Sequence, residues 1–514
     1  MPDPGGVPTT GMKPEVVIVG AGPVGCSLAL GLAHHGVRSL LIERSREIAR
    51  ESRALVIWPR TAELLRDWGA WEPLLAAGRF TTVFTPHDAT RDEALLSIDF
   101  SDIADSVESP GVLFIPQYDT VRILRERVEA NPLCELRYDE EAVELEQDDS
   151  EVRVRTLGSN GGRTHAAPFV VGADGANGFV RHALGFALQG ATYATRVAIA
   201  DVEIESRVRS YPSPRIALDA PGLLVGIEYA PGIWRTIASV APSAGDDAAL
   251  APEAHAARIA HLFGEQARSA QVYWSSLFRI HRRHAPNFIS GRVALAGDAA
   301  HLNSPAGGQG MNAGIHDTAN LAWRLSCALR SSHCAQALLV GYDIERREMQ
   351  HDSIERTTDL ATRLAVYTPP ALKRLAFAWM RRSLRARGMR RKACRTLGML
   401  DGRYTRSPDV DTSHPLAGRR IGDVALDNGR RINEERCGRA ALLCCGGAQI
   451  EGVASLALAK PPKRWLLKHP SAIVIRPDGF VAAVIEKPTR ERVDRMWKRA
   501  FCCATPLPGT ETAR

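Results

Sequence analysis

A stretch of small and acidic residues, 291–325, holds the groups best suited to bind a polar ligand. Its apolar segment 293–296 is followed by Gly297 and Asp298. Gly297 lets a ligand approach the backbone closely, and the carboxylate of Asp298 can accept a hydrogen bond from a hydroxyl. The glycine-rich run 307–310 then opens a predicted helix, whose first N–H groups have no partner within the helix. These donors and the helix dipole favour a ligand that carries or develops negative charge.

A second glycine motif lies near the N-terminus. Three glycines have the spacing G-x-G-x-x-G: Gly20, Gly22 and Gly25. The β-branched segment 16–19 precedes them, and a predicted helix to about residue 35 follows. A second predicted strand, 39–42, ends at Glu43, whose carboxylate can accept from ribose hydroxyls and disfavours a 2′-phosphate. Together these features predict a dinucleotide-binding βαβ unit, with NAD and FAD as alternatives.

The elements between the two motifs determine how they are brought together. The buried strand predicted over 169–172 ends near Asp174-Gly175, which alone is a common turn. Gln117 precedes a predicted helix. Strand-like segments from 192 to 280, with a helix near 251–270, suggest a mainly antiparallel sheet. We therefore expect a discontinuous first domain with a sheet inserted into it.

Length and composition restrict the class of protein. The 514 residues are too many for one core, and the ten cysteines contain no Cys-x-x-Cys pair, so we expect reduced thiols and no metal site. No apolar run approaches the roughly 20 residues of a membrane span, and the first residues lack a signal peptide's apolar core, so a cytoplasmic location is expected. The net charge of +7 favours an anionic cofactor or substrate rather than nucleic acid. A basic run over 373–395 is interpreted as a solvated helix face.

The motifs, in this order, resemble those of the FAD-dependent aromatic hydroxylases, the single-component flavoprotein monooxygenases related to p-hydroxybenzoate hydroxylase and phenol hydroxylase. The resemblance rests on residues 170–181 (VVGADGANGFVR), 297–325 and 341–347 (GYDIERR). The segments 415–420 and 475–479 resemble the thioredoxin-like C-terminal domain of phenol hydroxylase and of polyketide hydroxylases.

The resemblance implies an α/β fold. A Rossmann-like FAD-binding domain would carry an inserted, mainly antiparallel substrate sheet and be followed by a small thioredoxin-like C-terminal domain. The segment 405–414 is interpreted as a linker. The expected divisions are 14–190 for the first part of the FAD-binding domain (with 80–115 contributing to the substrate domain), 191–285 for the substrate sheet, 286–404 for the second part of the FAD-binding domain and its helices, and 415–514 for the thioredoxin-like domain.

The resemblance also implies roles for individual residues. Asp298 would bind the ribityl chain of FAD. Arg53 and Gln117 would lie along the phosphates and the ribityl chain of FAD. Asp174 would lie near a groove shared by FAD and the nicotinamide donor, and 307–312 would meet the pyrimidine side of the flavin. The full expected set of cofactor-binding residues is Gly20, Gly22, Gly25, Glu43, Arg44, Arg53, Gln117, Asp174, Asp298, Pro305, Gly308, Gly310, Met311 and Asn312. The sequence departs from many relatives at Gly178, where they have Ser, and at Asn303-Ser304-Pro305, where they have paired prolines.

The family chemistry implies an NAD(P)H-dependent monooxygenase that hydroxylates an aromatic, phenolic or polyketide-like substrate with O₂ through a flavin C4a-hydroperoxide. Baeyer–Villiger oxidation or epoxidation on the same fold, and a non-catalytic flavin-binding sensor, are the alternatives. The sequence identifies no catalytic base, since His301, His316 and Tyr229 are as well explained by ordinary packing. The expected partners are an aromatic small molecule and O₂, without nucleic acid or an integral membrane segment, and a homo-oligomer is compatible with the sequence.

Overall fold

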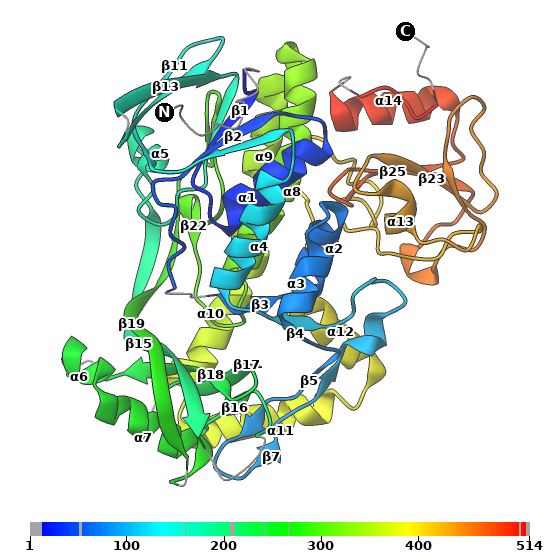
Figure 1. Cartoon of the computed structure of the whole chain (residues 1–514). Coiled ribbons are helices and arrows are strands. Elements are labelled where there is room, and N and C mark those ends of the chain that lie inside the picture. Colours follow the sequence, from blue (N-terminus) through cyan, green and yellow to red (C-terminus); the bar gives the residue numbers. More distant parts are fainter. Residues whose placement is uncertain are drawn as a thin grey trace.

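The computed structural model describes residues 13–50, 54–159, 161–205, 211–220, 222–241, 243–265, 267–502 and 505–509. The chain is a mixed α/β protein in which two large sheets share the N-terminal three quarters, and a third sheet lies in the C-terminal region, residues 405–509 (Figure 1). No helix in the described ranges is long and apolar enough to cross a membrane.

A six-stranded sheet carries both glycine motifs. Its strand order is β10-β2-β1-β14-β21-β20, and every pairing is parallel except that of β20 with β21. Because central parallel strands are buried on both faces, β1, β2, β14 and β21 are short apolar runs, and the sequence predicted all four of them. The bounds are β1 (Val16–Val19), β2 (Ser39–Ile42), β10 (Cys134–Arg137), β14 (Phe169–Gly172), β20 (Ile289–Ser290) and β21 (Val293–Leu295).

Strands far apart in the sequence become neighbours in this sheet. Val16 of β1 pairs with Phe169 of β14, and Val170 of β14 pairs with Val293 of β21. The carboxyl ends of these three strands therefore meet at one edge, where ligands bind in open α/β sheets. The helices that pack beside the sheet are α1 (Pro23–His34), α4 (Gln117–Glu129), α8 (Gly310–Arg330) and α9 (Ala335–Met349).

An eight-stranded, mainly antiparallel sheet extends from the same edge. Its order is β22-β19-β15-β18-β17-β16-β6-β7, so the short strands at 87–94 join it by the one parallel pairing, β6 with β16. His284 of β19 pairs with His301 of β22, three residues after Asp298, which attaches the sheet to the second glycine motif. The bounds are β6 (His87–Asp88), β7 (Glu93–Ala94), β15 (Gln189–Glu205), β16 (Arg215–Ile216), β17 (Leu224–Ala230), β18 (Ile233–Val240), β19 (Arg268–His284) and β22 (His301–Leu302).

Smaller elements complete this part of the chain. The alternating segments 141–147 and 151–156, with the turn residues 148–150 between them, predict a hairpin, which is confirmed, and a third strand joins it. The strands are β3 (Val56–Ile57), β4 (Arg79–Thr81), β5 (Val83–Phe84), β8 (Ile98–Asp99), β9 (Val112–Phe114), β11 (Glu140–Gln147), β12 (Val152–Gly158) and β13 (Gly161–Ala167). The helices are α2 (Pro59–Asp67), α3 (Trp71–Ala77), α5 (Phe179–Ala183), α6 (Asp246–Leu250), α7 (Pro252–Phe263), α10 (Arg356–Thr362), α11 (Pro370–Ser383) and α12 (Arg387–Leu397). The short 3₁₀ and π turns are η1 (Phe100–Ile103), η2 (Gly297–Ala299), η3 (Ser332–Cys334), η4 (Gln350–Glu355) and η5 (Arg363–Tyr367).

The C-terminal region packs beside α8 and α9 (Figure 1). In its sheet β23 pairs parallel with β24 and antiparallel with β25. The strand-like segments 472–476 and 480–485, with Pro477-Asp478-Gly479 between them, predict a hairpin, which β25 and β26 form. The apolar residues within 465–467 predict a strand, and this prediction is wrong: Lys463–Trp465 is a 3₁₀ turn, η6, that ends with Leu466 at φ +57°. The bounds are α13 (Ile432–Arg436), β23 (Ala441–Cys445), β24 (Leu456–Leu458), β25 (Ser471–Ile475), β26 (Val481–Glu486) and α14 (Arg490–Phe501).

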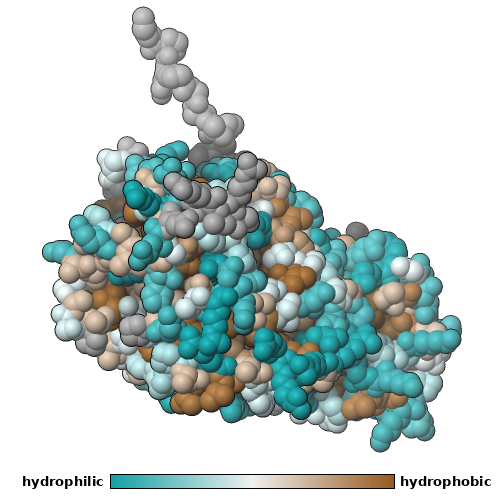
Figure 2. All heavy atoms as spheres, turned by 90° about the horizontal axis from the view of Figure 1, so that it is seen from below, coloured by the Kyte–Doolittle hydropathy of each residue, from teal (hydrophilic) through white to brown (hydrophobic). Residues whose placement is uncertain are grey.

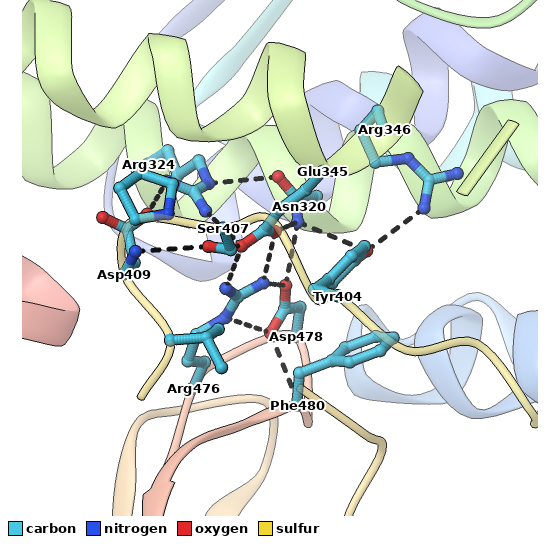
Figure 3. A network of polar contacts seen from close by, with 12 residues as sticks. Asn320, Arg324, Glu345, Arg346, Tyr404, Ser407, Asp409, Arg476, Asp478 and Phe480 are labelled. Carbon is cyan, nitrogen blue, oxygen red and sulfur yellow. Dashed lines mark hydrogen bonds and ion pairs between the residues drawn. The ribbon is translucent and has the colours of Figure 1, made fainter. Parts of the chain in front are cut away.

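Buried polar contacts join the C-terminal region to α8 and α9 (Figure 3). Arg476 donates to both carboxylate oxygens of Glu345, at 2.5 and 2.8 Å. Ser407 donates to Glu345, and Asp409 accepts from Arg324, each at 2.5 Å. The segment 405–414, expected to be a linker, is therefore anchored by buried side chains, because Ser407 and Asp409 both bond to charged groups on the helices.

Candidate functional site

The first glycine motif forms a tight turn between β1 and α1. A Cβ on Gly20, where φ is +103°, would lie 2.6 Å from the carbonyl oxygen of Ala173. A Cβ on Gly25 would lie 1.9 Å from the carbonyl oxygen of Gly20, so only glycine lets the helix pack against the turn. Gly22, by contrast, faces open space within 4 Å and precedes α1 without a side-chain cap. The turn thus leaves room for a ligand at the start of the helix.

Glu43 lies against this turn. Its Oε2 accepts from the backbone N–H of Ala21 at 2.8 Å and lies 3.4 Å from Nη2 of Arg125. Arg125 in turn donates to the carbonyl oxygen of Ala21 at 3.0 Å. The half-buried carboxylate is therefore fixed at the end of β2, beside the glycines, whereas the side chain of its neighbour Arg44 is exposed.

The second glycine motif lies directly against the first. Gly297 has φ +61°, and a Cβ there would lie 2.7 Å from a methyl group of Val24 in the first turn of α1. A Cβ on Gly314 of α8 would meet the same side chain at 2.6 Å. Asp298 is exposed although Gly297 and Ala299 are buried. The two glycine motifs, more than 270 residues apart in the chain, thus lie together in the fold, and the carboxylate of Asp298 is exposed beside them.

The loop before α8 is tied down by one side chain. The fully buried Asn312 accepts from the N–H of Trp58 at 3.0 Å and donates to the carbonyls of Val56 and Gly308 at 2.9 and 2.8 Å. Its side chain therefore orients the loop against β3. Within that loop Pro305 is exposed and accepts from the N–H of Gly308 at 2.9 Å. Gly310 and Met311, which begin α8, are half-buried.

Another residue expected at the cofactor site is Gln117. Gln117 begins α4, and its Oε1 accepts from the N–H of Ala54 at 3.2 Å. Arg53 lies outside the described residues.

Asp174 lies beside the first motif, because a Cβ on Gly20 would be 3.0 Å from its Cα. One carboxylate oxygen accepts from the N–H of Val180 at 2.9 Å, and the other is buried without a hydrogen-bond partner in the described ranges. Burial raises the pKa of Asp174 above its usual value. A Cβ on Gly178 would lie 2.1 Å from this second oxygen and 2.9 Å from the carbonyl oxygen of Gly175, so a larger residue at this position would require the loop to shift.

A basic groove of about 650 Å³ lies beyond this loop, between residues 176–188 and β19. Arg181 at its edge donates to the carbonyls of Ala176 and Ala299, which links the loop to the Gly297-Asp298 motif. The other basic side chains that line the groove are His182, Arg279, His281 and Arg283.

Sequence reasoning missed Asp317, which supports the second motif from behind. Its Oδ2 accepts from the N–H of Gly297 at 2.9 Å and lies 2.7 Å from Nε2 of His301. Its Oδ1 accepts from Nε of Arg346 at 2.7 Å. Burial alone would raise the pKa of Asp317, but the charges of His301 and Arg346 lower it to about 2. An acidic residue on the buried face of the predicted helix was the available signal.

The candidate bases have structural partners. His301 is held by Asp317, and Nε2 of His316 lies 3.0 Å from the Thr61 hydroxyl, while burial lowers the pKa of His316 well below its usual value. Burial, followed by the nearby Asp201 carboxylate, raises the pKa of Tyr229 above its usual range. No cluster of possible metal ligands occurs among the residues that the structure describes.

A parallel sheet with a glycine turn and helix at the carboxyl end of β1 defines the class of dinucleotide-cofactor oxidoreductases. The chain belongs to the FAD binding domain family, whose sequence profile matches residues 13–357.

Similar proteins identify the reaction class. A 6-methylpretetramide 4-monooxygenase of Streptomyces rimosus is 34% identical over 65% of this chain and 59% of its own length. A protein of Bacillus subtilis named as an uncharacterized aromatic compound monooxygenase is 30% identical over 92% of this chain and 95% of its own. The solved structure of an anhydrotetracycline hydroxylase from Streptomyces rimosus has a TM-score of 0.78 and 28% identity, and the match covers 96% of this chain and 100% of that one. The chain is an FAD-dependent aromatic monooxygenase that uses NAD(P)H.

Proposed function

We propose that the enzyme hydroxylates a bulky phenolic or polyketide-like aromatic compound, and that its cofactor site is the surface where the two glycine motifs meet. The contact between Val24 and Gly297 carries this proposal, because it brings the dinucleotide turn and Asp298 within reach of one extended cofactor. The names of the relatives, which include a pretetramide monooxygenase and an anhydrotetracycline hydroxylase, support a polycyclic substrate.

The residues at this surface fit FAD. The open side of Gly22 and the N-terminus of α1 accommodate a pyrophosphate, and Glu43 would accept from the adenosine ribose. The exposed Asp298 would accept from a ribityl hydroxyl, and Arg53 and Gln117 would lie along the same path. When bound, FAD supplies electron transfer from NAD(P)H and oxygen activation.

The protein's own contribution to the reaction is electrostatic. The first N–H groups of α8 and its dipole would stabilise negative charge on a ring held against 307–312, as an oxyanion hole does. Asn312 holds this loop in place by three hydrogen bonds, so the backbone N–H groups of the loop are oriented before a ligand arrives. The eight-stranded sheet, attached by the pairing of His284 with His301, would form the opposite wall and exclude water.

The nicotinamide donor would occupy the basic groove beside Asp174. Its lining of arginines and histidines suits the phosphates of a dinucleotide, and Arg181 connects the groove to the carbonyl next to Asp298. NADH and NADPH remain alternatives, since both carry a pyrophosphate.

We also propose that the domain divisions of the sequence analysis hold, with a thioredoxin-like C-terminal domain. The order β24-β23-β25-β26 and the final helix α14 support this domain. Its structural role is supported by the absence of a Cys-x-x-Cys pair in the sequence. A cytoplasmic location would give access to NAD(P)H.

The test is oxidation of NADPH and NADH by the purified flavoprotein against a panel of phenols and polycyclic aromatic compounds, with the product mass measured. We expect one ligand class to stimulate oxidation and to gain one oxygen as a hydroxyl. A lactone or epoxide product would support the alternative oxygenations instead. No stimulation by any ligand would support a sensor, and peroxide release equal to O₂ use would indicate an oxidase. Asp298→Ala should purify with less FAD than the native protein.

A further inference from the structure

Helix α11 presents an apolar stripe to solvent. Leu372, Leu375 and Trp379 are 53%, 65% and 67% exposed, and their spacing places them on one side of the helix. Leu360 of α10 and Tyr367 of η5, which precede α11 in the chain, are also exposed, at 70% and 50%. Figure 2 views the molecule from the end where α11 lies in Figure 1, and it shows brown apolar patches among extended teal areas.

The other side of α11 already has its packing partners. Phe377, Met380 and Leu384 pack against a core cluster that includes Phe100, and Lys373 donates to the carbonyl of Gly222. The helix is therefore apolar on two sides, of which only one is needed for folding. A helix of this kind normally has a partner or a membrane on its second side.

The charges on the segment of the chain that carries this stripe are of one sign. Every charged residue from 360 to 400 is basic. Arg390, Arg391 and Arg395 pair with aspartates of the same molecule. Four exposed arginines at the end of α11 and just beyond it form no ion pair within the described ranges: Arg381, Arg382, Arg385 and Arg387. We name these four residues the arginine cluster.

We propose that α11 and the arginine cluster bind the surface of a membrane that contains anionic lipids. Leu372, Leu375 and Trp379 would enter the boundary between headgroups and acyl chains, and the cluster would contact lipid phosphates. A second copy of the chain would present the same wholly basic segment, so the charge favours an anionic surface over self-association. The helix would lie in the membrane plane, since its 14 residues are too few to span a bilayer.

The test is flotation of the full-length flavoprotein with vesicles of phosphatidylglycerol and phosphatidylcholine, compared with vesicles of phosphatidylcholine alone. We expect binding only to the anionic vesicles, and weaker binding as salt increases. The double variant Arg381→Glu/Arg382→Glu should lower partitioning at least about thirtyfold, because each basic side chain near an anionic surface strengthens binding about fivefold. Leu375→Ser/Trp379→Ser should also lower it, by removing the inserted apolar groups.

Two controls match these variants. Lys460→Glu/Lys463→Glu reverses two exposed charges on the C-terminal region, and Leu466→Ser removes an apolar side chain that is 58% exposed. Both should bind vesicles like the native protein, and all variants should keep native flavin content and melting temperature. The proposal is overturned if the native flavoprotein does not float with anionic vesicles, or if the α11 variants and the controls behave alike. Dimerisation that Leu375→Ser/Trp379→Ser abolishes, without any vesicle binding, would assign the stripe to self-association instead.

Discussion

At the scale of single residues, the site depends on glycines that serve different purposes. Gly25 is required by the fold itself, because any side chain would collide with the backbone of Gly20. Gly22 is not, since a Cβ there meets no protein atom within 4 Å and its φ of −75° is open to any residue. A requirement for glycine at Gly22 would therefore come from the ligand.

This difference predicts opposite outcomes for two matched substitutions. Gly22→Ala should fold with a free energy of unfolding within about 1 kcal/mol of the native value but bind FAD at least about tenfold more weakly, because the methyl group occupies the pyrophosphate path. Gly25→Ala should fold poorly. Urea denaturation of the apoprotein and flavin titration separate the two effects. Native FAD affinity in Gly22→Ala would contradict the assignment of the phosphates to this turn.

Asp317 provides a pH prediction. Its pKa is about 2 in the folded protein against an ordinary 3.8, so its charge stabilises the fold above about pH 4, and this stabilisation, about 2 kcal/mol, is lost as the pH falls towards 2. Asp317→Asn lacks this carboxylate. The difference in unfolding free energy between the native protein and Asp317→Asn should therefore shrink between about pH 5 and pH 3. A difference that stays constant over this range, measured by urea denaturation, would show that the charge of Asp317 does not stabilise the fold.

At the scale of elements, the N-terminus of α8 is positioned by β3 rather than by its own sequence. No side chain caps the helix, and the glycines before it adopt φ values of +87° and +62°. Asn312 compensates by bonding to three backbone groups: the carbonyl of Gly308 in the loop, the carbonyl of Val56 in β3, and the N–H of Trp58 directly after β3. The donors that face the cofactor site thus depend on a contact between segments more than 250 residues apart.

Removing this connection should weaken both the fold and the flavin site. Asn312→Ala leaves the buried N–H of Trp58 and two carbonyls without their partner, which costs about 2–4 kcal/mol of unfolding free energy. We expect lower flavin retention and more peroxide released per NAD(P)H oxidised, measured in the refolded holoprotein. Thr318→Ala on the same helix is the control, since its hydroxyl bonds only within α8, to Ile315. Equal peroxide release in both variants would exclude a special role for Asn312.

At the scale of the whole molecule, the C-terminal region is joined to the FAD-binding part through buried charge. Arg476, Glu345 and Arg324 are fully buried, and Glu345 keeps its charge because, although burial raises its pKa, Arg476 and Arg324 lower that pKa to about 2. The chain of contacts continues from Asn320 through Tyr404 to Arg346 (Figure 3). Arg346 in turn donates to Asp317, which lies behind Gly297. The two parts should therefore unfold together.

Substitution of Arg476 tests this coupling. Arg476→Leu leaves Glu345 and Asp478 buried without their main counter-charge, which should cost about 3–5 kcal/mol. Arg430→Leu breaks the exposed pair with Glu434 and should cost less than about 1 kcal/mol. Urea denaturation should show one transition for the native protein, with loss of flavin and loss of helix at the same midpoint. Separate midpoints would mean that the C-terminal region folds independently.

The sequence by itself determined the local elements and the class of cofactor. The strand of 16–19, its glycine turn and α1 follow from apolar runs and glycine spacing, which act over a few residues, and the motif around Asp298 was recognisable in the same way. Only the tertiary structure decided that Val24 touches Gly297, that Asp317 supports the motif from behind, and that 405–414 is anchored by Ser407 and Asp409. The physical reason is range: backbone preferences and hydrophobic periodicity are local, whereas these contacts join residues that become neighbours only when the sheets and α8 pack.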